Sequence, residues 1–308
     1  MSTPRRIEDL AAQALERLRP KAKSLIVTVY GDAVYPHGGS IWLGSLIKLL
    51  EPFGLNERIV RTCVFRLAKE HWLAASQIGR RSFYALTESG RHQIDAVNQR
   101  LYSAAPRSWD KLWTMVFTGL TGLDTEERET LRRELGWQGF GPLSAGVMLH
   151  PDPDETALRQ TLIDAGVGQK ALVMRGAAPG WVSPEVLREV IRGSWQIDRL
   201  AADYDDFLET FRPLWRAFEA AKTRDPAQCF LVRILLVHGY RRVLLRDPVL
   251  PDELLAADWP GAAARALCRN LYRLIQAPAE QYLMREAETA EGPLPVAAPF
   301  YAERFGGL

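Results

Sequence analysis

Basic and hydrogen-bonding side chains are concentrated between Asn56 and His71 at the spacing of one helical face. A helix over this stretch would bury Val60, Val64 and Leu67 on one side, with Cys63 beside them. The opposite side would then carry six side chains: Arg58, Arg61, Thr62, Phe65, Arg66 and Lys69. Arginine can bond two acceptors on a guanine edge, and every Lys or Arg attracts phosphate, so this face suits the major groove of DNA.

The neighbouring elements are those that would position such a helix. Residues 41–50 have an apolar face at helical spacing, residues 51–55 break that helix, and Asn56 can cap the next one. Residues 72–86 follow as a hairpin whose turn adds two cations, Arg80 and Arg81. Residues 24–32 are apolar enough for a strand or a helix. We expect a helix that packs over the two helices predicted at 41–50 and 57–71. A plain helical domain with a solvated basic face is the alternative, but the order of elements favours a winged helix-turn-helix.

Whole-chain properties indicate a multidomain globular protein. The 308 residues predict two or three domains, and no apolar run reaches the length of about 20 residues that a membrane span needs. Residues 1–105 contain 15 of the 39 Lys and Arg but 9 of the 37 Asp and Glu, which favours a nucleic-acid-binding N-terminal part. The N-terminus lacks a secretory signal, so we expect a cytoplasmic protein with no membrane partner. Cys63, Cys229 and Cys268 are predicted to be buried thiols.

The remainder of the chain predicts an α+β middle and a helical C-terminal region. We expect strands at 113–118, 145–150 and 170–176, helices at 125–135 and 154–165, and a further strand hidden near 136–142, which together make a ferredoxin-like fold. After Ser183 we expect helices at 184–192, 195–211, 214–223, 226–246 and 262–276, with Pro213 interrupting one of them and a loosely held C-terminal run. The predicted domains are 1–105, 106–180 and 181–308.

Enzymatic alternatives have weak support in the sequence. Gly136, Gly139 and Gly141 follow a helix rather than a strand, so a phosphate-binding loop is disfavoured. A ferredoxin-like nuclease would need a carboxylate at the end of its first strand, but Asp110 precedes that strand and Asp124 lies beyond the turn. An acyl-thioester hydrolase would need a nucleophile motif that the chain lacks. We therefore expect no catalytic residues, no metal site and no cofactor.

Motifs at both ends of the chain resemble those of one family. They are Ser24 to Asp32, Gly38 to Leu46, Glu57 to Leu67, Gly79 to Ser82, His238 to Arg242, Leu245 to Pro248, Leu250-Pro251 and Trp259 to Gly261. With them the sequence resembles the PaaX-type repressor family of phenylacetic acid degradation. The resemblance implies a dimeric bacterial repressor of operator DNA, with a winged helix, a middle domain similar to Cas2 proteins and a helical C-terminal domain. It also implies phenylacetyl-coenzyme A as the effector, although related regulators of other pathways leave the acyl group open.

A coenzyme A thioester combines phosphates with an adenine and an acyl group, so its site should combine arginines with aromatic faces. His238, Arg242 and Arg246 recur every four residues on one predicted helix. With the residues near them they form the predicted effector site: His238, Tyr240, Arg241, Arg242, Arg246 and Trp259. The alternative is structural, since Arg241 or Arg246 could instead pair with acidic residues of the loop that follows, and His238 could be a hydrogen-bonded core histidine.

Overall fold

The computed structural model of the chain describes residues 6–102, 109–119 and 122–308. The chain divides into two compact units. The first combines Met1–Ala104, Asp205–Arg242 and Gly261–Leu308, and the second combines Ala105–Tyr204 and Val243–Pro260. The predicted domain boundary between residues 105 and 106 lies outside the described residues. No helix in the described ranges has the length and apolar character that crossing a membrane requires.

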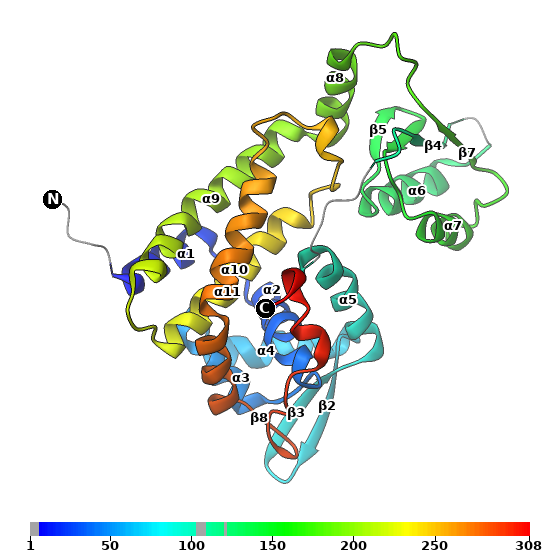
Figure 1. Cartoon of the computed structure of the whole chain (residues 1–308). Coiled ribbons are helices and arrows are strands. Elements are labelled where there is room, and N and C mark those ends of the chain that lie inside the picture. The colour runs from blue at the N-terminus through cyan, green and yellow to red at the C-terminus, as the bar shows by residue number, and fades with distance from the viewer. Residues whose placement is uncertain (1–5, 103–108, 120–121) are drawn as a thin grey trace. The chain divides into compact units, whose positions relative to one another are not determined.

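The N-terminal part of the first unit combines helices with a small sheet (Figure 1). In chain order it contains α1 (Ile7–Leu18), α2 (Ala22–Val29), η1 (Tyr30–Val34), η2 (Tyr35–His37), β1 (Ser40–Trp42), α3 (Leu43–Leu50), η3 (Glu51–Phe53), α4 (Glu57–Lys69), β2 (Leu73–Ile78), β3 (Arg81–Leu86) and α5 (Glu88–Tyr102). The three strands form an antiparallel sheet in the order β1-β3-β2. The expected helix over residues 24–32 is confirmed, because α2 continues into the π-helical turn η1.

Apolar faces of three helices form the core of this part. Ile26 on α2, Leu46 on α3 and Val60 on α4 are completely buried, and α4 contacts both of the other helices. The predicted break between α3 and α4 is confirmed as η3, which Gly54 follows as the C-cap with a φ of 76°. Glycine adopts this left-handed conformation without the steric cost that a Cβ atom would add, so the chain can turn there.

The remaining elements of the first unit come from the C-terminal region. They include parts of α9 (Ile197–Ala220), α10 (Pro226–Leu244) and α11 (Pro260–Glu286), followed by β8 (Glu288–Thr289), β9 (Gly292–Pro293), η5 (Pro299–Tyr301) and η6 (Arg304–Gly306). The helical character predicted after Ser183 is confirmed. Three predicted details were wrong. In the structure α9 continues through Pro213, α11 extends to Glu286 rather than ending at Gln276, and the C-terminal run is firmly held.

Tertiary packing explains these corrections. Proline removes one helical hydrogen bond, but Phe211, Leu214 and Phe218 around Pro213 are completely buried and hold α9 continuous. At the C-terminus, β8 and β9 pair through Thr289 and Gly292, and Phe305 is buried. A Gly- and Pro-rich sequence predicts weak local structure, and contacts with distant parts of the chain override that tendency.

The second unit contains a four-stranded antiparallel sheet. Its elements are β4 (Trp113–Phe117), α6 (Thr125–Trp137), β5 (Gly141–Ser144), β6 (Val147–His150), α7 (Glu155–Asp164), β7 (Leu172–Gly176), α8 (Pro184–Trp195) and η4 (Asp252–Leu254). The strand order β5-β6-β4-β7, with a helix after the first and third strands, is that of the predicted ferredoxin-like fold. The hidden strand near 136–142 is β5. One face of the sheet packs on α6 and α7, and Ile191, Leu250 and Leu254 pack on the other.

Candidate nucleic-acid interface

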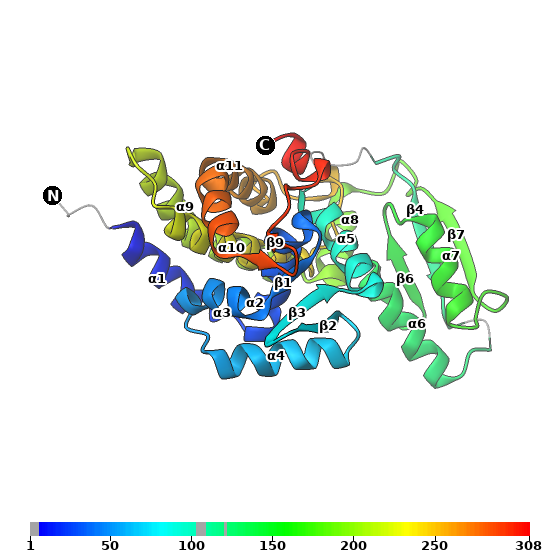
Figure 2. The same ribbon diagram turned by 90° about the horizontal axis from the view of Figure 1, so that it is seen from below.

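Helix α4 separates its apolar and polar residues onto two sides. Asn56 caps its N-terminus by accepting a hydrogen bond from the Ile59 amide at 3.0 Å. Val60, Val64 and Leu67 are buried, as predicted. All six residues predicted to face outward are exposed: Arg58, Arg61, Thr62, Phe65, Arg66 and Lys69. Figure 2 shows α4 beside the β2–β3 hairpin.

The cations of this face are available to a ligand to different degrees. Arg61 forms an ion pair with Glu57 at 2.7 Å, and Lys69 lies over the ring of Phe65 at 4.9 Å. Arg58 and Arg66 have no side-chain partner among the described residues. Exposed ion pairs contribute about 0–1 kcal/mol, so the Arg61 pair can open when phosphate or a base edge approaches. The face is thus a row of accessible cations with a large aromatic ring, 57% exposed, at its centre.

The hairpin places Arg80 and Arg81 in different environments. Ile78 pairs with Arg81 across a two-residue turn in which Gly79 has a φ of 60°. Arg80, at the turn, is exposed. Arg81 instead forms an ion pair with Glu288 of β8 at 2.7 Å and lies 4.4 Å from the ring centre of Trp42. The contact between the β2–β3 hairpin and the C-terminal hairpin formed by β8 and β9 was not predicted, because Glu288 is remote from Arg81 in sequence.

The residues predicted to bind the effector are divided between the two units. His238, Tyr240, Arg241 and Arg242 belong to the first unit, and Arg246 and Trp259 belong to the second. Arg246 forms an ion pair with Asp203 at 3.0 Å, and Trp259 packs edge-on against Tyr204. This ion pair joins Arg246 to α9, whereas the structural alternative named acidic residues of the following loop as partners. The assignment of these six residues to an effector site stays a prediction.

The four members in the first unit have intrachain contacts. The Nη2 atom of Arg241 donates to the carbonyl and hydroxyl oxygens of Ser24, and Arg242 donates to the Leu18 carbonyl at 2.8 Å. Tyr240 is buried against Phe207. His238 is also buried, with its Nδ1 atom 3.1 Å from the Thr28 hydroxyl, and burial with help from Arg241 and Arg242 lowers its pKa to about 3. This is the environment of a neutral core histidine.

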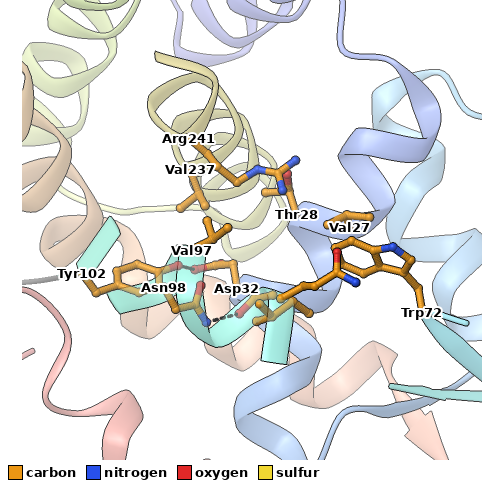
Figure 3. Close-up of a pocket in the computed structure, with 12 residues that line it drawn as sticks. Val27, Thr28, Asp32, Trp72, Val97, Asn98, Tyr102, Val237 and Arg241 are labelled. Atoms are coloured by element: carbon orange, nitrogen blue, oxygen red, sulfur yellow. Dashed lines mark hydrogen bonds between the residues drawn. The ribbon is translucent and has the colours of Figure 1, made fainter. Parts of the chain in front are cut away.

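Arg241 also lines a small cavity (Figure 3). Figure 3 shows its side chain extending from α10 toward Thr28, while Val27 and Val97 contribute apolar surface. The cavity has about 20 Å³ of space for solvent, which suits one or two water molecules rather than an aryl group. The Nε atom of Arg241 is buried without a partner in the described ranges, and burial lowers the pKa of this guanidinium.

A buried polar network in the first unit was missed by the sequence analysis. Asp32 receives hydrogen bonds from Tyr102 at 2.6 Å, Tyr272 at 3.0 Å, Arg233 at 2.7 Å and Arg304 at 3.0 Å. Burial raises the pKa of both tyrosines well above their usual range, so both hydroxyls stay protonated and can donate. The network joins η1, α5, α10, α11 and the C-terminal segment.

Glu280 extends this network. Arg233 donates to it at 2.7 Å, Tyr301 at 2.9 Å, and His37 lies 2.5 Å away. Burial alone would raise the pKa of Glu280, but the hydrogen bond with His37 and the charge of Arg233 lower it to about 2. His37 lies in the short 3-10 helix η2 and is 2% exposed. Its partner Glu280 is too distant in sequence for a local motif to reveal.

The carboxylates considered for a nuclease have structural roles. Asp110 pairs with Arg175 at 2.7 Å, and Asp124 caps α6 through the Glu127 amide. Within the described ranges, no group of three or more His, Cys, Asp or Glu side chains is arranged to hold a metal ion. Cys63, Cys229 and Cys268 are buried free thiols, as predicted.

Comparison with known proteins gives a consistent result along the chain. Family models match three segments: PaaX-like protein at residues 21–90, the PaaX protein central Cas2-like domain at 106–188, and the PaaX-like protein C-terminal domain at 195–285. The transcriptional repressor PaaX of Escherichia coli is 38% identical over 304 residues, covering 98% of this chain and 96% of that protein. A solved structure of an uncharacterised protein from Mycobacterium tuberculosis is 25% identical, with a TM-score of 0.49, and the match covers 76% of this chain and 89% of that one. The chain belongs to the PaaX-like protein family.

Proposed function

We propose that this protein is a transcriptional repressor of phenylacetic acid catabolism that binds operator DNA through α4 and the β2–β3 hairpin. The observation that carries the proposal is the exposed row of cations on α4, of which Arg58 and Arg66 have no side-chain partner in the described part of the chain. The relative in Escherichia coli is named a transcriptional repressor. The family is one of regulators rather than enzymes, so we assign no catalytic residues and no cofactor.

In this proposal α3, α4 and the β2–β3 hairpin form a winged helix-turn-helix. Helix α4 enters the major groove, where Arg58, Arg61 and Arg66 read base edges or neutralise phosphates. The hairpin is the wing, and Arg80 at its turn contacts the DNA backbone. Phe65 and Thr62 complete the contact surface, since both are exposed between the arginines.

The repressor is proposed to act as a homodimer that an aryl-acyl-coenzyme A releases, with phenylacetyl-coenzyme A as the first candidate. Two reading helices of a dimer match half-sites that lie about 34–36 Å apart, one helical turn of DNA. An effector that binds better to a geometry without this match weakens operator binding by linkage, and each tenfold loss needs about 1.4 kcal/mol of differential binding.

The test is binding of the purified protein to DNA from upstream of its own gene, at fixed salt. Phenylacetyl-coenzyme A, coenzyme A and phenylacetate are added in separate titrations. Release by the thioester alone supports both the repressor role and the effector class. Tight binding that none of the three changes would keep the DNA-binding function and refute the effector, leaving a regulator of another pathway. Absence of specific binding would refute the proposal.

A further inference from the structure

A groove in the second unit lies between α7 and the β4–β7 side of the sheet. Its volume is about 560 Å³, within the range of about 300–1,000 Å³ that is usual for small-molecule sites. Leu158, Leu162 and Ile163 line it from α7, and Val173 and Met174 line it from β7. The lining is thus mainly aliphatic, which suits an apolar group.

The register of the strands explains how the floor of the groove is built. Thr114 pairs with Arg175 and Val116 pairs with Val173, so these side chains share the face of the sheet that α7 covers. Val116 belongs to the packed core under the helices. Thr114 and Arg175 lie farther along this face, where they line the groove.

One residue that lines the groove has a hydroxyl whose hydrogen-bonding requirement is unmet among the described residues. Thr114 is 3% exposed, and its Oγ1 atom has no hydrogen-bond partner in the described part of the chain. A buried hydroxyl without a partner costs about 1–3 kcal/mol, so such atoms are rare unless something else satisfies them. A ligand carbonyl in the groove would accept this hydrogen bond. Thr118, directly after β4, has a second hydroxyl without a partner among the residues that the structure describes, but it does not line the groove.

The charges around the groove favour an anion at one position. Arg175 is held by Asp110 at 2.7 Å and by Glu155 at 3.2 Å, so its charge is compensated. Arg159 on α7 is exposed and has no ion-pair partner among the described residues. The groove therefore combines apolar walls, one buried hydroxyl donor and one uncompensated cation.

We propose that this groove binds the acyl end of an acyl thioester, whose carbonyl oxygen accepts a hydrogen bond from Thr114 and whose anionic carrier lies at Arg159. The inference rests on the proposed function for the class of effector. It places that effector between α7 and the sheet instead of at the six residues predicted between His238 and Trp259. Phenylacetyl-coenzyme A has all three required parts: an apolar aryl group, a thioester carbonyl and phosphates.

The first experiment measures binding of phenylacetyl-coenzyme A to full-length variants by calorimetry. Thr114→Val removes the hydroxyl while keeping the shape, and we expect affinity to fall about three- to tenfold with no loss of folding stability. Thr118→Val is the matched control and should bind as the wild type does. Arg159→Gln should weaken binding of the thioester and of coenzyme A, whereas Arg133→Gln on α6 should change neither. Wild-type affinity in Thr114→Val, or equal losses in the two threonine variants, would overturn the proposal.

The second experiment locates the ligand by hydrogen–deuterium exchange with and without phenylacetyl-coenzyme A. We expect protection in α7 and β7. Protection confined to α10 would overturn the groove and support the site predicted from His238 to Trp259. If the wild-type protein binds its promoter but does not bind phenylacetyl-coenzyme A, the effector class and the groove assignment are refuted. The DNA-binding function then still stands. Release from DNA by the thioester with unchanged behaviour of Thr114→Val would refute the groove alone.

Discussion

Helices α4 and α10 both carry arginines at helical spacing, but the two sets of arginines have opposite environments. On α4, Arg58 and Arg66 are exposed. On α10, Arg233 is completely buried, and Arg241 donates to Ser24. Residue type and spacing alone therefore do not distinguish a cation that can meet a ligand from one that holds the fold together.

The residues between the arginines make the difference. The apolar residues of α4 fall on one side, so its cations remain on the other. On α10, Val232, Ile234, Leu235 and Leu236 are all completely buried, so the helix is apolar on every side there. An arginine within such a helix has to find acceptors inside the protein, and Arg233 finds Asp32 and Glu280. A helix that is apolar all round thus predicts structural arginines.

The largest expected effect is on stability, from the same substitution made in each helix. Arg233→Met leaves Asp32 and Glu280 without one of their cations, and breaking a buried ion pair in this way costs about 3–5 kcal/mol. Arg66→Met on α4 should stay within about 0.5 kcal/mol, since Arg66 is exposed. Urea denaturation monitored by circular dichroism gives both values. Equal free energies of unfolding for the two variants would contradict the contrast between the helices.

Arg66, whose substitution should hardly change stability, should matter more for DNA binding. Arg66→Met should weaken binding to the operator by about 1–3 kcal/mol if Arg66 reads a base, with a smaller effect on unrelated DNA. Fluorescence anisotropy with operator and scrambled duplexes at one salt concentration measures the difference. Arg133→Met, an exposed arginine on α6, is the control and should change neither affinity. Parallel losses on both duplexes would instead assign Arg66 to phosphate.

Local pattern was enough to predict the α4 face. The cap at Asn56, the buried stripe and the exposed cations all follow from residues within one helix, and the hairpin follows from the residues directly after it. The order of strands and helices likewise gave the ferredoxin-like middle. Each of these features is decided by neighbours in sequence.

Features that join distant segments could not be predicted in this way. Asp32 and Arg233 are separated by 201 positions, and His37 and Glu280 by 243, so nothing near either residue indicates its partner. The groove could not be predicted either. The alternation of side chains along the strand indicates that Thr114 is buried, but not that its hydroxyl has no acceptor among the described residues. Continuity of α9 through Pro213 also depends on packing that only the folded chain supplies.

The pH dependence of stability tests whether His238 on α10 is a core residue. The hydroxyl of Thr28 donates to the Ser24 carbonyl and so accepts from the Nδ1–H group of neutral His238. The pKa of His238 is about 3 in the folded protein against 6.5 for the ordinary side chain. As the pH falls, the unfolded chain therefore binds a proton at this side chain before the folded chain does. The stabilisation is complete above pH 6.5 and is lost as the pH falls toward 3, with a slope of about 1.4 kcal/mol per pH unit. Urea midpoints between pH 7.5 and 5 should fall less steeply in His238→Gln; parallel curves would show that this histidine does not contribute.

The smallest expected effect concerns Arg81, whose environment is intermediate between those of the two helices. It lies on the hairpin that is proposed to touch DNA, but Glu288 holds it in an exposed ion pair. Glu288→Gln removes this competing charge, so Arg81 can neutralise a phosphate. Because exposed pairs contribute about 0–1 kcal/mol, binding to any duplex should tighten about two- to fivefold. One additional phosphate contact should also steepen the dependence of log K on log salt by about 0.9. Glu291→Gln, on the same C-terminal hairpin, removes an equal charge that has no ion pair with Arg81 and serves as the control. An equal gain in both variants would show that general repulsion by the acidic residues of this hairpin, rather than the ion pair of Arg81, limits DNA binding.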